Sequence, residues 1–178
     1  MATNIYIVRH CKAEGQPPEA PLTQEGFEQA DELARFFTDK KIQRIISSPF
    51  TRAQQSIKPT AQQLGVQVEL DDRLAERILS SQPLDDWMDK LAASYEDMHL
   101  KFEGGESSQE ALRRALAVID EVKGGDEDAI IVTHGNLMSL ILQHYDDVSG
   151  FEKWKELSNP DVYHLSFDEG SNLQRIWR

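Results

Sequence analysis

The chain has 178 residues, 39% of them hydrophobic and 28% charged, which predicts a single globular domain over residues 1–178. Its net charge of −12, from 31 acidic and 19 basic residues, disfavours nucleic acid and anionic membranes as partners. The single cysteine excludes an internal disulfide framework, and the absence of a signal-peptide or membrane-spanning pattern gives the cytoplasm as the expected setting.

The first part of the chain alternates strand and helix patterns. The apolar run at residues 5–8 is typical of a buried strand. A helix follows within residues 18–41, and Thr23 is placed to cap its N-terminus. A second strand is predicted over residues 42–48. This alternation is typical of proteins that surround a sheet with helices.

The next predicted helix contains a proline. Pro49 is expected to open this helix, Pro59 to disturb it and Gly65 to end it. Residues 66–70 alternate between apolar and polar side chains, which predicts a third strand.

Residues 78–106 interrupt the alternation and are expected to form an insertion that covers one end of the sheet. Within them, residues 83–99 have a helical pattern. A further helix starts at Ser107, with Glu110 placed for a capping box. The remaining predicted elements are that helix over 107–122, a strand over 129–134, a helix over 135–145 and a closing hairpin of 162–167 and 173–177.

These elements predict an α/β fold: a three-layer sandwich with a mostly parallel sheet, helices on both faces and an antiparallel edge strand. Ligands of open α/β sheets bind beyond the carboxyl ends of the strands. Arg9 and His10 follow the first strand, Arg52 follows the second, and His134 and Gly135 follow the strand at 129–134. Arginines, histidines and a helix N-terminus converging on one place suit a phosphoryl group.

Six segments of the chain resemble, in order, the signature segments of the histidine phosphatase superfamily, also called the phosphoglycerate-mutase-like fold. They are VRHCKAE, APLTQEG, SSPFTRAQQS, RLAER, GGESSQE and IIVTHGN. The resemblance implies that His10 is the nucleophile and becomes transiently phosphorylated. It implies that Arg9, Arg52 and His134 bind the phosphoryl oxygens, and that Glu76 donates the proton to the leaving group.

The resemblance also implies the activity, which is that of a metal-independent phosphomonoester hydrolase of the histidine acid phosphatase type without a cofactor. Gln16 and Gly135 join the predicted phosphate-binding set. The expected partner is a phosphorylated small molecule, with a phosphoprotein as another possibility; the sequence does not give the oligomeric state. Three residues depart from the family pattern, namely Cys11 in place of Gly, Ala13 in place of Ser or Thr, and Gln16 in place of Asn.

Two other chemistries are disfavoured by the residues themselves. A cysteine phosphatase loop has an arginine six positions after its cysteine, and here Pro17 occupies that position after Cys11. His10, His134 and Glu76 could form a two-histidine, one-carboxylate metal site, but two arginines beside them would repel the cation.

Three other activities within the resemblance stay open. They are phosphoglycerate mutase-type phosphoryl transfer, dephosphorylation of protein phosphohistidine, and phospho-ligand binding without turnover. The stretch between Glu76 and His134 is compact, and few residues follow the closing hairpin. Such a site is expected to be open to water, which favours hydrolysis over transfer.

Overall fold

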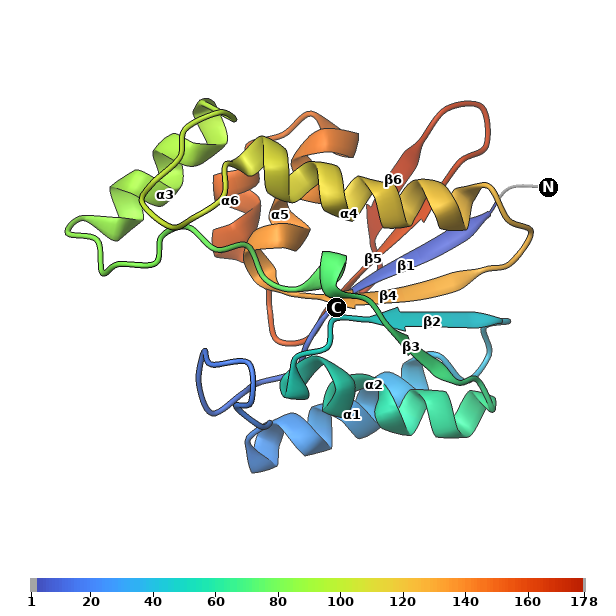
Figure 1. The fold of residues 1–178 in the computed structure, drawn as a ribbon. Helices are drawn as coiled ribbons and strands as arrows, with labels where there is room; N and C mark the ends of the chain where they lie inside the picture. The colour runs from blue at the N-terminus through green and yellow to red at the C-terminus, as the bar shows by residue number, and fades with distance from the viewer. Residues whose placement is uncertain (1–2, 178) are drawn as a thin grey trace.

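A computed structural model describes residues 3–177, and a single sheet of six strands forms its centre (Figure 1). The strands lie in the order β3-β2-β4-β1-β5-β6. β3, β2, β4 and β1 pair in parallel, whereas β5 runs antiparallel to β1 and to β6. The strands are β1 (Asn4–Arg9), β2 (Arg44–Ser47), β3 (Val68–Leu70), β4 (Ala129–Thr133), β5 (Asp161–Ser166) and β6 (Asn172–Arg175).

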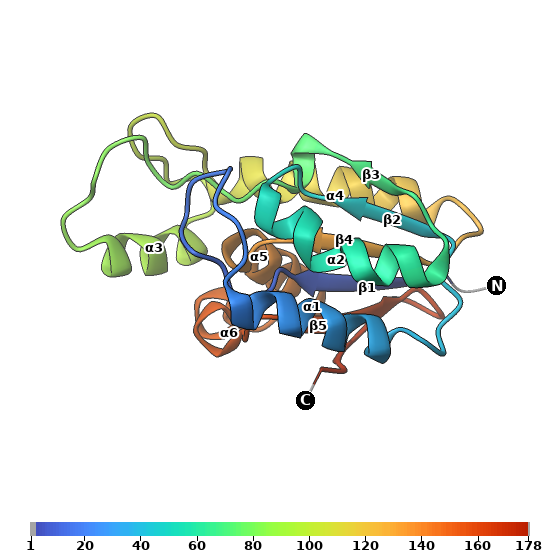
Figure 2. The same cartoon turned by 90° about the horizontal axis from the view of Figure 1, so that it is seen from below.

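Helices cover both faces of this sheet, which confirms the predicted three-layer α/β fold (Figures 1 and 2). One face carries α1 (Gln24–Phe36) and α2 (Thr51–Leu64). The other carries α4 (Ser108–Lys123), α5 (Gly135–Asp146) and α6 (Gly150–Glu156). α3 (Trp87–Glu96) extends beyond the sheet on the side where the parallel strands end, and a short 3-10 turn spans Asp72–Leu74.

The alternation of side chains along the central strands divides the core between the two faces. Ile5 and Ile7 of β1 belong to the apolar cluster under α4 and α5, whereas Val8 belongs to the cluster under α1 and α2. In β4, Ile131 and Ile130 divide in the same way. A strand covered on both faces is apolar throughout, and each such buried side chain stabilises the fold by about 1.5–3 kcal/mol.

The predicted helix ends are largely confirmed. The Thr23 hydroxyl accepts a hydrogen bond from the Gly26 amide at the start of α1. At the start of α4, Ser107 and Glu110 form both bonds of a capping box. Gly65 ends α2 in the left-handed conformation, with a φ of 68°. Short polar side chains and glycine therefore mark these three helix ends.

The expected break at Pro59 is wrong, because α2 continues through it, and the helix begins at Thr51 rather than at Pro49. Pro59 has no amide hydrogen, so the helix loses one internal hydrogen bond at this point. Its neighbours Ile57 and Thr60 are fully buried beneath the helix. Packing of this helical face keeps the turn intact. The short helix α6, capped by Ser149, was not predicted.

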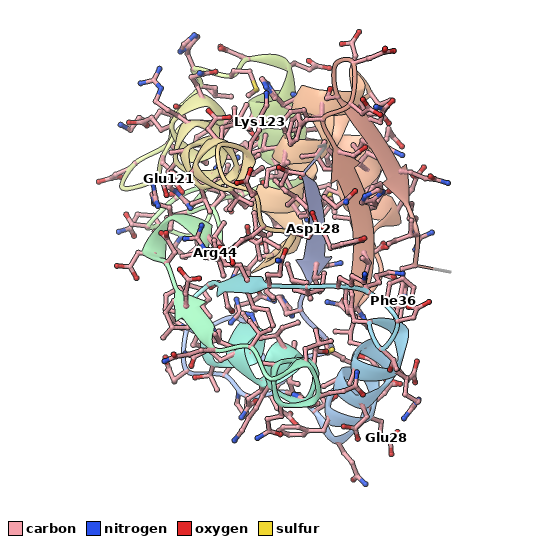
Figure 3. All side chains as sticks on the ribbon, turned by 90° about the vertical axis from the view of Figure 1, so that its right-hand side faces the viewer. Glu28, Phe36, Arg44, Glu121, Lys123 and Asp128 are labelled. Atoms are coloured by element: carbon pink, nitrogen blue, oxygen red, sulfur yellow. The ribbon has the colours of Figure 1, made fainter. Side chains whose placement is uncertain are left out.

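The amino ends of the parallel strands lie away from α3, on the side that faces the viewer in Figure 3. There Arg44 forms a bidentate ion pair with Glu69, at 2.8 and 3.0 Å. Asp128 accepts a hydrogen bond from the backbone amide of Asn4. These contacts fasten the strand ends that are farthest from the predicted site.

Residues 78–106 consist of α3 and the two irregular stretches that flank it. The Trp87 side chain is 50% exposed, and its ring contacts Trp154 of α6 edge to face at a centroid distance of 6.1 Å. The role of this segment as a cap over the site stays a prediction. Within residues 3–177, no helix is both long and apolar enough to cross a bilayer.

Replacement of Ser107 with Ala tests the capping box. We expect the free energy of unfolding to fall by about 1 kcal/mol, because the Glu110 amide loses its acceptor at the start of α4. Urea denaturation followed by circular dichroism measures the change. Ser171→Ala, at an exposed position outside the helices and strands, is the control and should leave the midpoint unchanged. Equal midpoints for both variants would contradict the stabilising role of the capping box.

Candidate active site

A small cavity opens at the carboxyl ends of the parallel strands. Its volume is about 140 Å³, below the roughly 300–1,000 Å³ of pockets that enclose a whole drug-sized ligand. Its walls come from strand ends, from the loop after β1 and from the first turns of two helices. The lining residues are Arg9, His10, Lys12, Ala13, Gly15, Gln16, Arg52, Glu76, Gly135 and Asn159.

His10 is held in one tautomer at this cavity. Its Nδ1 lies 2.7 Å from the Cys11 carbonyl oxygen, and because a carbonyl can only accept, Nδ1 carries the proton. Nε2 therefore keeps its lone pair and has no hydrogen-bond partner within residues 3–177. The side-chain amide of Asn159 donates to the His10 carbonyl at 3.0 Å and fixes the backbone.

The surroundings of His10 favour its neutral, nucleophilic form. Burial, together with the guanidinium groups of Arg52 and Arg9, lowers the pKa of His10 to about 4. The lone pair on Nε2 is therefore available at neutral pH. Cys11 beside it is fully buried, and burial raises the pKa of its thiol to about 12. A thiol of this kind is a packing group and not a nucleophile.

The two arginines reach the cavity from different elements. Arg9, at the end of β1, donates from Nη1 to the Leu157 carbonyl at 3.1 Å, while its buried Nε has no partner in the described chain. Arg52, in the first turn of α2, is only 2% exposed and donates from Nη1 to the Pro17 carbonyl at 2.8 Å. The remaining N–H donors of the two guanidinium groups can bind an oxyanion from two sides.

His134 directly follows β4, and its ring lies beside that of His10. The two ring centroids are 5.0 Å apart. His134 Nε2 lies 2.8 Å from the Ser48 hydroxyl, which also accepts a hydrogen bond from the Phe50 amide. Ser48 can therefore donate its own proton to Nε2, which leaves Nδ1 as a donor. This Nδ1 is buried without a partner within residues 3–177, and burial lowers the pKa of His134 well below its usual value.

The carboxylate of Glu76 is bound by the N-terminus of α5. It accepts hydrogen bonds from the amides of Asn136 at 3.0 Å and Leu137 at 2.8 Å, and from the Arg77 amide at 2.8 Å. The sequence suggested that this helix N-terminus would bind the phosphoryl group, and these two amides instead hold the carboxylate. Burial raises the pKa of Glu76, although the amide donors and Arg9 oppose the shift.

The fold thus brings the predicted residues together. Arg9, His10, Arg52 and Glu76 line one cavity, and Gln16 and Gly135 join them. The His134 ring lies beside that of His10, although His134 is not among the residues that line the cavity. Sequence reasoning missed three side chains. Lys12 and Asn159 also line the cavity, and Ser48 orients His134. Asn159 follows its partner His10 by 149 residues and carries no local signal in the sequence.

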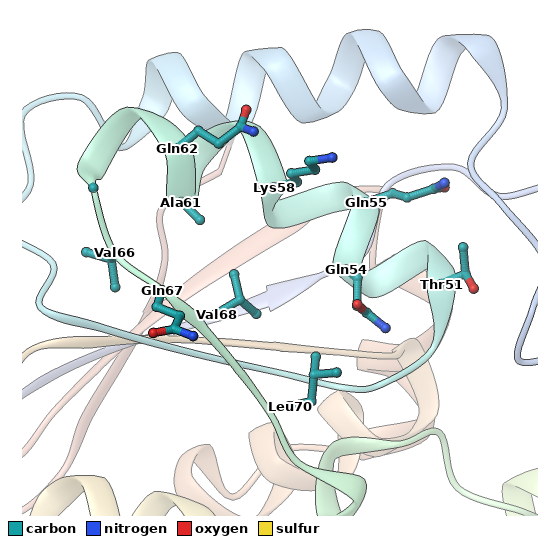
Figure 4. A pocket seen from close by; sticks show the side chains of 11 residues that line it. Thr51, Gln54, Gln55, Lys58, Ala61, Gln62, Val66, Gln67, Val68 and Leu70 are labelled. Atoms are coloured by element: carbon teal, nitrogen blue, oxygen red, sulfur yellow. The ribbon is translucent and has the colours of Figure 1, made fainter.

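A larger groove lies elsewhere, between α2 and the edge strand β3 (Figure 4). Its volume is about 780 Å³, and its lining includes apolar side chains such as Val68 and Leu70 and four glutamines. Lys58 is the only ionisable side chain in the lining. A groove with one ionisable group lacks the acid, base and nucleophile that catalysis requires, so the smaller cavity is the candidate active site.

Comparison with known proteins agrees with this geometry. A family model described as the histidine phosphatase superfamily, branch 1, matches residues 5–178. The chain belongs to the histidine phosphatase superfamily. A provisionally named phosphoserine phosphatase 2 from Hydrogenobacter thermophilus is 29% identical over 155 residues, 78% of this chain and 76% of that protein. A provisionally named phosphoglycerate mutase GpmB from Yersinia pestis is 30% identical over 97% of this chain and 89% of its own length.

Solved structures of phosphatases share the fold of this chain. A mycobacterial glucosyl-3-phosphoglycerate phosphatase superposes with a TM-score of 0.77 at 21% identity, over 99% of both chains. A phosphoserine phosphatase mutant from Entamoeba histolytica, in complex with phosphoserine, superposes with a TM-score of 0.78 at 20% identity, over 97% of this chain and 95% of that one. Superfamily and neighbours together support an enzyme of the phosphatase or mutase type.

Gly135→Ala tests the contact between Arg9 and the first turn of α5. A Cβ at position 135 would lie 2.8–3.0 Å from three atoms of the Arg9 guanidinium, so this group has to move. We expect phosphate affinity to fall about tenfold, the effect of one lost charge-assisted hydrogen bond. Isothermal titration calorimetry with inorganic phosphate measures it.

Gly125→Ala is the matched control for this prediction. A Cβ there would meet only the Val122 carbonyl at an ordinary 3.5 Å. Alanine is the better helix former at position 135, so melting temperature separates a site effect from a loss of fold. Unchanged phosphate affinity in Gly135→Ala would show that Arg9 is not held by this close contact.

Proposed function

We propose that this protein is a metal-independent phosphomonoester hydrolase that acts through a phosphohistidine intermediate on His10. The single observation that carries the proposal is the tautomer of His10. Its Nδ1 proton is bound by the Cys11 carbonyl, which leaves the Nε2 lone pair in a cavity between two arginines. A neutral imidazole among fixed cations is arranged to attack a phosphoryl dianion.

The first step transfers the phosphoryl group to His10. The Nε2 lone pair forms a bond to phosphorus while the ester P–O bond breaks. Arg9, Arg52 and the Nδ1 of His134 stabilise the charge on the three equatorial oxygens. The leaving oxygen takes a proton from the Glu76 carboxyl group, whose raised pKa favours the protonated acid.

The second step releases inorganic phosphate. The Glu76 carboxylate accepts a proton from a water molecule as that water attacks phosphorus. The N–P bond then breaks, and the electron pair returns to Nε2 of His10. Glu76 ends this step protonated and His10 neutral, so the site is ready for another substrate.

The size of the cavity bears on the substrate. At about 140 Å³ it accommodates the phosphoryl group, and the rest of the molecule would extend toward residues 78–106. We propose a phosphorylated small molecule, because the similar phosphatases have such substrates in their names or titles, among them phosphoserine and glucosyl-3-phosphoglycerate. Phosphoglycerate mutase activity is the second candidate, favoured by the similarity to the GpmB protein.

His10→Ala in excess EDTA tests the nucleophile and the absence of a metal requirement. We expect the wild type to hydrolyse p-nitrophenyl phosphate in EDTA and the variant to lose at least about 1,000-fold in kcat, because the covalent route is removed. Phosphate release measures both. His99→Ala, at an exposed histidine, is the control and should retain full activity.

Two results would count against this assignment. Turnover in His10→Ala equal to that of the wild type would remove His10 as the nucleophile. Phosphoryl transfer between the 2- and 3-positions of phosphoglycerate, without release of phosphate, would replace the hydrolase with a mutase.

Glu76→Gln tests the proton donor. We expect kcat/KM for an alkyl phosphate to fall about 100-fold or more, because an alkoxide leaves poorly without a proton. The loss for p-nitrophenyl phosphate should be at least tenfold smaller, since p-nitrophenolate is a good leaving group. Glu19→Gln, at an exposed loop position, serves as the control. Equal losses on both substrates would remove Glu76 from the acid role.

A further inference from the structure

Arg114 of α4 binds the backbone that carries Glu76. Its Nη1 donates to the Arg73 carbonyl at 2.7 Å and to the Ala75 carbonyl at 2.8 Å. Ala75 directly precedes the proposed proton donor. This one guanidinium nitrogen therefore holds the backbone on the N-terminal side of Glu76 through two separate carbonyls.

Glu106 completes the contact on the other side. Its carboxylate forms a bidentate pair with Nε and Nη2 of Arg114, and its Oε1 also accepts a hydrogen bond from the Ile78 amide at 3.2 Å. In addition, the Arg77 guanidinium donates to the Glu106 carbonyl at 3.1 and 3.3 Å. Arg114 and Glu106 together hold residues 73–78 on both sides of Glu76, and we call this pair the clamp.

The clamp is more constrained than an ordinary surface ion pair. Both side chains are only 22% exposed, and each makes backbone hydrogen bonds in addition to the pair itself. Glu106 lies in GGESSQE, one of the six segments that resemble the superfamily. The capping residue Ser107 follows directly, so the start of α4 fixes where Glu106 stands.

Glu76 needs such support because it lies outside every regular element. The 3-10 turn before it ends at Leu74, and the next helix is α3 at Trp87. Among the described residues 3–177, the carboxylate accepts hydrogen bonds only from the amides of α5 and of Arg77. A proton donor displaced by about 1 Å can lose most of its effect, so its backbone has to be fixed.

We propose that Arg114 and Glu106 are positioning residues for Glu76, and that they set how well the enzyme expels poor leaving groups. This inference rests on the proposed function, because it assigns the clamp to the acid of that reaction. Arg114 suits the role because one planar guanidinium can meet two carbonyls and a carboxylate at once. The point charge of a lysine cannot reproduce that geometry.

Arg114→Met tests the proposal through the dependence on the leaving group. We expect kcat/KM for an alkyl phosphate to fall about tenfold or more and that for p-nitrophenyl phosphate to fall less than about threefold. The double variant with Glu76→Gln should lose no more than Glu76→Gln alone, because the two residues act through one proton. Arg114→Lys should recover only part of the alkyl phosphate rate.

Arg44→Met is the matched control. It removes the same side chain from another bidentate pair, with Glu69, at the opposite ends of the strands (Figure 3). We expect a smaller loss of stability than in Arg114→Met, because this pair is more exposed, and no change in the ratio of kcat/KM between the two substrates. Hydrogen exchange of the amides over residues 73–78 should increase in Arg114→Met and stay unchanged in Arg44→Met.

The outcomes separate this inference from the proposed function. A wild-type protein that hydrolyses no phosphomonoester would overturn the function, and the exchange measurement would still test the clamp. Equal losses on both substrates, or an additive double variant, would overturn the positioning role while the hydrolase stands. If Arg114→Met fails to fold, the ratio of kcat/KM between the two substrates can be measured in Glu106→Gln and Arg114→Lys. An unchanged ratio in both variants would also overturn the positioning role.

Discussion

The arrangement of this site depends on cationic groups placed where the sheet ends. Beside His10, Arg52 is almost fully buried and Arg9 is partly buried, an environment that is costly for charge. Backbone carbonyls from distant parts of the chain satisfy part of each guanidinium. The donors that remain, together with a neutral histidine, fit a doubly charged phosphoryl group. Burial and, to a smaller extent, the same charges keep His10 unprotonated.

The N-terminus of α5 binds a different group from the one that helix N-termini commonly bind in folds with parallel sheets. Helix N-termini in such folds often bind the phosphate directly. Here the amides of Asn136 and Leu137 bind the carboxylate of Glu76 instead. In the proposed mechanism the arginines and histidines bind the phosphoryl group, and the positive end of α5 holds Glu76, the proposed acid. Gly135, directly before these amides, lets the helix approach Arg9 closely.

Two separate parts of the fold support the proposed nucleophile, His10, and the proposed acid, Glu76. The stretch from Leu157 to Asn159, just before β5, binds Arg9 and the backbone of His10. The other support is the clamp of Arg114 and Glu106, which binds the backbone on both sides of Glu76. Each half of the proposed chemistry can therefore be disturbed separately.

The sequence by itself determined most of the elements, the helix caps at Thr23 and Ser107, and the residues at the strand ends. These are local features, because periodicity, capping and motif order act over a few residues. The tertiary structure alone decided what each residue meets. Nothing near Pro59 in the sequence records the packing that keeps its helix whole, and the helix-breaking tendency of proline predicted the opposite. The partners of His10, His134 and Glu76, namely Asn159, Ser48 and the α5 amides, lie 149, 86 and 60 or 61 residues away. Contacts over such separations arise only when the sheet brings its strand ends together, and for that reason a single sequence contains no local signal for them.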